Sequence, residues 1–256
     1  ACTSLLSGCS FLVTTEHGAP YTPDDVIAML EEEFADYGPH IVLQSAETER
    51  PAPMQRNRYV LYDEANDFTF SCTAYVRHCT LPVPQPFAQR AADADHAYAA
   101  AYAIHLNPRI GEVAAQHGLY AATTEEAAAL RDSKVKRPAG TNDEVSLFRG
   151  GDFIFADEDT RPEEMVYALR EIHHLYAPKG HGAVPSALHG RDITFYYLPK
   201  AETDRTRAIE LTFFTLWSDD WKGTLANKLH HQGDKYDAAM EKELANNFSS
   251  MLHSAR

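Results

Sequence analysis

The chain has 256 residues, of which 44% are hydrophobic and 23% are charged. This composition is typical of a globular protein, and the length is sufficient for one large hydrophobic core or two small ones. The formal net charge of -14 argues against nucleic acid as a partner, because phosphate binding requires clustered lysine and arginine. No apolar run approaches the roughly 20 residues needed to cross a bilayer, so a location at a membrane would require an anchor.

The first 21 residues are predicted to be a signal-peptide remnant, a lipobox and a tether. Leu6-Ser7-Gly8-Cys9 resembles the bacterial lipobox, in which the signal is cut before a cysteine that then carries lipid. We expect that the sequence begins inside the signal and that Cys9 is lipidated. A cut next to Cys2 is one alternative, and a buried Cys9 in an N-terminal strand is another. The polar, turn-rich residues 14–21 fit a tether.

The segment from Thr22 to residue 130 predicts helices around an antiparallel hairpin. Proline and acidic residues suit the first turn of a helix, whereas proline in a helix interior removes a hydrogen bond. A T-x-x-E pattern at Thr123 predicts a capping box. The predicted elements are a helix from Pro23 to the stop at Gly38-Pro39, a hairpin within 58–78 turning at 64–67, a helical region at 94–118 interrupted at Asn107-Pro108, and a capped Ala-rich segment after Thr123.

The second part, 131–256, predicts a similar series of elements. Alternating apolar residues favour strands, and the 3.6-residue apolar period favours helices. The predicted elements are strand-like segments at 144–148 and 152–156, a helix from Pro162 that Pro178 stops, a hairpin within 191–217 with a loop at 200–206, and a helical region at 221–253 interrupted near Gly233.

Two segments of the chain resemble one another. The segment that begins at Thr22 aligns without a gap with the segment that begins at Arg161, with proline, an acidic pair, leucine, tyrosine and a second proline in register. Any two amphipathic helices share some of these features, which is the alternative to duplication. We therefore predict an α+β fold of two related helix–antiparallel strands–helix units, 22–130 and 131–256, rather than alternating βαβ units.

The order of these elements, with the segments YVLYDEANDFTFSCTAYV, SLFRGGDFIF and HHLYAP, resembles uncharacterised surface lipoproteins of Gram-positive bacteria. The resemblance covers most of the chain, but its motifs are core and capping residues. It implies an α+β ectodomain that is lipid-anchored, extracytoplasmic and displayed at the cell surface. It implies no reaction and no catalytic residues.

Thirteen histidines make a metal site one hypothesis, and the densest group is His173, His174, His181 and His189. Imidazole suits zinc, but this spacing matches no known ligand motif, and HExxH and CxxC are absent. A mixture of core and surface histidines is the alternative.

Aromatic residues gather near the predicted second hairpin and could form an exposed face that binds a peptide or a glycan. The candidates are Tyr196, Phe214, Trp217 and Trp221, and their burial in the core is the alternative. Cys72 and Cys79 could pair in an oxidising exterior. One extended strand, however, would hold them about 23 Å apart on opposite faces, so the geometry favours two free buried thiols over a disulfide.

The sequence lacks the complete motifs for calcium binding, phosphate binding and a serine nucleophile. Asp157–Asp159 lacks the later ligands of a calcium loop, and the Gly-rich stretch 149–152 lacks the ending of a phosphate loop. G-x-S-x-G is absent. The sequence leaves enzymatic activity open and favours a non-catalytic, lipid-anchored module without a cofactor that binds a protein or a cell-wall component. A zinc-type or hydrolytic surface lipoprotein that uses the histidines is the alternative.

Overall fold

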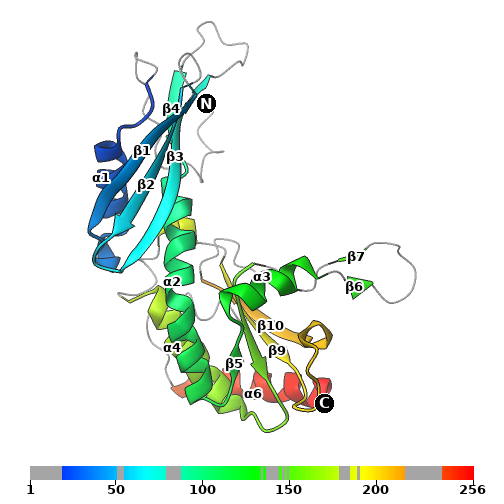
Figure 1. Cartoon of the computed structure of the whole chain (residues 1–256). Helices are drawn as coiled ribbons and strands as arrows, with labels where there is room; N and C mark the ends of the chain where they lie inside the picture. The colour runs from blue at the N-terminus through cyan, green and yellow to red at the C-terminus, as the bar shows by residue number, and fades with distance from the viewer. Residues whose placement is uncertain are drawn as a thin grey trace, which may run out of the picture. The chain divides into compact units, whose positions relative to one another are not determined.

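A computed structural model describes residues 19–50, 55–78, 88–133, 135–136, 144–145, 148, 150–178, 185–188, 191–216 and 238–256. The chain divides into two compact units (Figure 1). Unit 1 comprises the described residues of Ala1–His105 with Pro185–Ala187, and unit 2 those of Leu106–Val184 and Leu188–Arg256. The division falls inside one helix, whereas the sequence analysis places it after residue 130. Both units combine helices with a four-stranded sheet, which confirms a mixed α+β fold.

Unit 1 is an antiparallel sheet in the order β1-β2-β3-β4, preceded by one helix and followed by another. Its elements are α1 (Pro23–Glu33), the short helix η1 (Ala35–Tyr37), β1 (Ile41–Arg50), β2 (Arg56–Asp63), β3 (Phe68–His78), β4 (Ala88–Ala92) and the first part of α2 (Ala94–Gln116).

Local chemistry accounts for α1 and for the hairpin. Thr22 and Asp25 form a reciprocal capping box, and Pro23 occupies the first turn. Gly38 adopts the left-handed conformation that ends the helical segment, with φ 61°. The turn between β2 and β3 lies at residues 64–67, as predicted. The flanking strands β1 and β4 were not predicted, because β1 is polar and exposed along most of its length.

A buried carboxylate organises the core of unit 1. Asp63 accepts hydrogen bonds from the Tyr98 hydroxyl (2.7 Å), from the Asn66 side chain (2.8 Å) and from the backbone N–H of His40 (3.1 Å). Desolvation alone would raise the pKa of Asp63, but these hydrogen bonds hold it below its ordinary value. Asp63 therefore stays ionised and fixes the hairpin turn against α2.

Cys72 lies in β3 as a buried free thiol, and burial raises its pKa to about 12. Cys79 lies outside the described residues, so the choice between a disulfide and two free thiols is not tested for this residue.

The predicted interruption at Asn107-Pro108 is wrong, because α2 runs from Ala94 to Gln116 with Pro108 inside it. Pro108 is exposed, so water can solvate the carbonyl that loses its helical partner. The neighbouring Asn107 is also anchored: its amide donates to the Ala122 carbonyl (3.1 Å) and accepts from the Thr124 N–H (3.0 Å).

Unit 2 contains a mixed sheet in the order β10-β9-β8-β5 and a separate short strand pair. Its elements are the rest of α2, β5 (Tyr120–Ala121), α3 (Thr124–Asp132), β6 (Val135–Lys136), β7 (Glu144–Val145), β8 (Asp152–Ala156), α4 (Pro162–Tyr176), β9 (Asp192–Tyr197), η4 (Arg205–Arg207), β10 (Ile209–Thr215) and α6 (Ala238–Ala255). The capping box of Thr123 and Glu126 and the hairpin of β9 and β10 agree with the sequence analysis.

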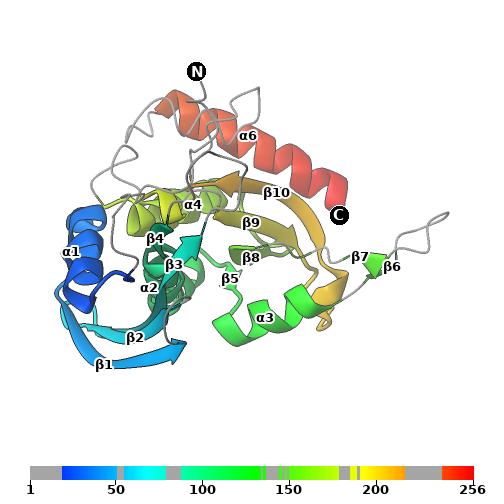
Figure 2. The same ribbon diagram turned by 90° about the horizontal axis from the view of Figure 1, so that it is seen from above.

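The exclusion of a βαβ unit is wrong for this part of the chain. Strands β8 and β9 are parallel, and α4 connects them. Every residue of β8 is buried, as expected of a strand covered on both faces. Figure 2 shows α6 on one face of this sheet and α3 on the other. Phe248 of α6 packs on Phe195 of β9, with 5.1 Å between ring centroids.

Candidate functional site

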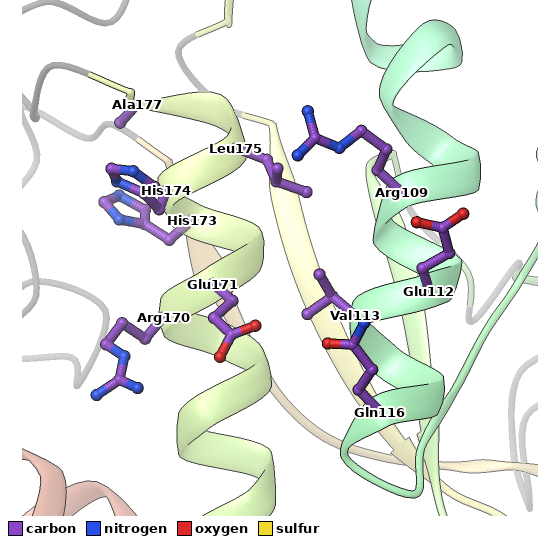
Figure 3. Close-up of a pocket in the computed structure, with 10 residues that line it drawn as sticks. All are labelled: Arg109, Glu112, Val113, Gln116, Arg170, Glu171, His173, His174, Leu175 and Ala177. Atoms are coloured by element: carbon purple, nitrogen blue, oxygen red, sulfur yellow. The ribbon is translucent and has the colours of Figure 1, made fainter.

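A cavity of about 510 Å³ lies between α2 and α4 in unit 2 (Figure 3). Its size falls in the range of sites that hold small ligands, about 300–1,000 Å³. The C-terminal half of α2 supplies one wall, because residues three and four apart share a helix face. Four residues of this face line the cavity: Arg109, Glu112, Val113 and Gln116.

Helix α4 supplies the opposite wall. Figure 3 shows Leu175 and Glu171 of α4 and Val113 of α2 lying in the space between the two helices, with Arg109 extending from α2 toward α4. The cavity is therefore lined by apolar side chains and by charged groups of both signs.

The charged lining residues differ in how far they are already paired. Arg170 contacts Glu241 of α6 at 2.5 Å, and Glu171 contacts His117 at 3.3 Å. Within the described part of the chain, neither Arg109 nor Glu112 has an ion pair or a side-chain hydrogen bond. These two side chains are the charges that remain available to a ligand.

His117 connects α2 to α4 beside the cavity. Its Nδ1 lies 2.8 Å from Glu164 and its Nε2 lies 3.3 Å from Glu171, two carboxylates two turns apart on α4. A carboxylate can only accept, so the His117 ring is the donor in its hydrogen bond to Glu164. The hydrogen bond from His117 lowers the pKa of Glu164, with a further contribution from Arg161. His117 therefore holds Glu171 in place at the wall of the cavity.

A second cavity, of about 360 Å³, lies where the parallel strands β8 and β9 end. Its charged residues are mostly paired with one another: Lys200 lies 2.5 Å from Asp159 and 3.7 Å from Asp157, and Thr160 donates to Asp157. A ligand here would have to displace these contacts, so this cavity is the weaker candidate.

The structure places two of the four predicted histidine ligands. His173 is buried on α4, His174 is exposed next to it, and both line the cavity of about 510 Å³. His181 and His189 lie outside the described residues. Among the residues that the structure describes, no group of three or more His, Cys, Asp or Glu side chains is arranged to hold a metal ion.

The predicted aromatic face is corrected for its two described members. Tyr196 is 1% exposed and Phe214 is 3% exposed, so neither presents its ring to a ligand. They point to opposite faces of the sheet: Tyr196 of β9 stacks on Phe155, whereas Phe214 of β10, which lies opposite Ile193, packs on Phe248. Trp217, Trp221 and the lipobox cysteine Cys9 lie outside the described residues.

Sequence reasoning missed the residues that line the cavity on α2. The spacing of Arg109, Glu112, Val113 and Gln116 is a helical one, but a helix predicted to break at Pro108 conceals it. The contacts of His117 with α4 join positions 47 and 54 residues apart, so the local sequence around His117 does not predict them.

No protein family, curated protein or solved structure matches the chain. The helices of the described part include none that is long and apolar enough to cross a bilayer. The chemistry of unit 2 and the sequence motif near the N-terminus are therefore the features that bear on function.

Replacing His117 by Gln is expected to lower the free energy of unfolding by about 1–2 kcal/mol, because one charge-assisted hydrogen bond is lost. The folded-state pKa of Glu164 is lowered, so its contribution to stability is present above the ordinary value and is lost as the pH falls through the folded value. In H117Q the pKa of Glu164 rises towards its ordinary value. The variant should therefore lose less stability than the wild type as the pH falls through this range.

The measurement is urea unfolding of both proteins across pH 3–8. His253 is exposed on α6, and H253Q is the matched control with no expected change. An H117Q curve that parallels the wild type over the whole range would contradict the assigned contacts.

Proposed function

We propose that this chain is a lipid-anchored, extracytoplasmic binding module for a protein or cell-envelope ligand, and that the cavity between α2 and α4 is its ligand site. The observation that carries the binding role is a cavity of about 510 Å³ lined by apolar side chains and by charged groups of both signs. The motif LSGC at 6–9 and the resemblance to Gram-positive surface lipoproteins support the anchor and the location.

The contacts of His117 favour a binding role over a catalytic one. A general base needs a nitrogen that is free to take a proton from a substrate. Both ring nitrogens of His117 face carboxylates, so this histidine is suited to holding the wall. No cofactor is part of the proposal.

A zinc-type or hydrolytic role needs three protein ligands at one point. The described candidates His173 and His174 are neighbours on one helix and differ in direction by about 100°. They therefore favour the binding role.

We also infer that α1 with the β2–β3 hairpin and α4 with the β9–β10 hairpin descend from one duplicated segment. Both helices begin with proline and an acidic pair, and a helix follows each set of strands. Among the described residues of unit 1 no strand corresponds to β8, which is parallel to β9, so the structural support for a duplication covers the helix and the hairpin.

The anchor is tested by expressing the protein from its whole coding sequence in a bacterial host with an alkyne-tagged fatty acid. The expected result is that the protein is labelled and partitions into detergent, whereas C9S is unlabelled and stays in the aqueous phase. C2S is the matched control and should behave as wild type. Labelling that survives in C9S and is lost in C2S would move the anchor to Cys2, and an unlabelled wild type would contradict anchoring.

A further inference from the structure

We propose that the cavity between α2 and α4 takes a short peptide that carries both a free ammonium group and a free carboxylate, with Arg109 receiving the carboxylate and Glu112 the ammonium. This inference rests on the proposed binding function and names the chemistry of its ligand.

The side chains of Arg109 and Glu112 have no ion pair within the described residues. Arg109 and Glu112 lie one turn apart on α2, where residues share a face with their Cβ atoms about 5–6 Å apart. They have opposite signs and both line the cavity. The other two charged side chains of the lining, Arg170 and Glu171, already contact protein groups.

The second step concerns the groups between and below these charges. A guanidinium binds a carboxylate through two parallel hydrogen bonds, and a glutamate accepts from an ammonium. The Gln116 side chain can both donate to and accept from a peptide bond. Val113 and Leu175 offer apolar contact for small aliphatic side chains (Figure 3). A peptide of about three residues uses all of these groups, and the cavity of about 510 Å³ can hold one.

The third step uses the charge of the whole chain. With a formal net charge of -14, the protein repels a ligand that carries only negative charge. A ligand with only positive charge would place a cation beside Arg109. A zwitterion has no net charge, and it complements both side chains at once.

Three probe peptides separate the two charges: tri-alanine, its N-acetylated form and its C-amidated form. Isothermal titration calorimetry with the whole soluble chain is expected to give the tightest binding for tri-alanine. Each capped peptide should bind about two- to fivefold more weakly, because one ion pair with an exposed side chain is lost. R109Q should weaken tri-alanine to the level of the amidated peptide, and E112Q to the level of the acetylated peptide.

The variants also make a sharper prediction. R109Q should leave the amidated peptide unaffected, because that peptide lacks the carboxylate, and E112Q should likewise leave the acetylated peptide unaffected. The controls K242Q on α6 and E125Q on α3 remove the same charges from exposed positions elsewhere in unit 2 and should change no affinity.

Equal affinities for the three peptides, no binding of tri-alanine, or equal losses in the control variants would overturn the inference. If chemical-shift mapping finds another class of ligand in the cavity while tri-alanine fails, the proposed binding function stands and this ligand assignment is wrong. If no ligand of any class binds there, both are wrong.

Discussion

Replacing Arg191 by Met is expected to lower the free energy of unfolding by about 3–5 kcal/mol, because it leaves a buried carboxylate without its charge partner. Asp152 is 4% exposed and lies 2.8 Å from the Arg191 guanidinium. The Tyr176 hydroxyl donates to Asp152 (2.7 Å) and accepts from Arg191 (2.9 Å). Burial and the adjacent Asp152 raise the pKa of Tyr176, so the hydroxyl keeps its proton as a donor.

Equilibrium unfolding in guanidinium chloride, followed by circular dichroism, gives the size of this effect. Y176F removes one hydroxyl and keeps the ion pair, so it should cost about 1–2 kcal/mol. R191K keeps the positive charge but loses the bidentate geometry of the guanidinium. Its loss of unfolding free energy should lie between those of Y176F and R191M. An R191M protein within about 1 kcal/mol of wild type would show that the three groups do not form one network.

Gly151→Ala is the second change with a large expected effect, about 3–5 kcal/mol, because backbone strain and a steric clash add. Gly151 has φ 111°, a conformation that side chains rarely adopt, and a Cβ there would lie 2.0 Å from the backbone carbonyl oxygen of Asp192. This clash falls where β8 and β9 pair, since Asp152 lies opposite Ile193 in the parallel register.

Gly118→Ala measures the cost of a positive φ without a steric clash, so it is the comparison for Gly151→Ala. Gly118 also has a positive φ, 69°, but a Cβ there would meet no atom within 4 Å. G118A should therefore cost only about 1–2 kcal/mol. Thermal unfolding of both variants is the measurement. Equal losses for G151A and G118A would mean that the close approach to Asp192 contributes nothing.

The elements that the sequence predicted correctly are those with local chemistry. Thr22 and Thr123 cap their helices through residues three positions away, and the hairpin at 64–67 follows from turn-forming residues between alternating strands. Short-range hydrogen bonds decide these features, so a short window of sequence contains the information.

The features that the sequence did not predict depend on residues far apart in the chain. The fully buried strand at 152–156 is compatible with parallel or antiparallel pairing, and only the crossover by α4 decides between them. Pro108 predicts a break in α2, but the helix continues through it. Pro108 is exposed to solvent, and the hydrogen bonds of Asn107 hold the helix at this point. The continuity of α2 forms one wall of the cavity, so the interruption predicted at Asn107-Pro108 concealed the candidate site.

The central claim is that the cavity between α2 and α4 binds a short peptide with a free ammonium group and a free carboxylate. The most direct measurement is an NMR titration of methyl-labelled protein with tri-alanine. The account predicts saturable shifts at the methyl groups of Val113, Leu175 and Ala177, which line the cavity, and unchanged signals from Val60 in unit 1 and Ile209 on β10. Shifts at Val60 or Ile209 with none at the three cavity residues would contradict it.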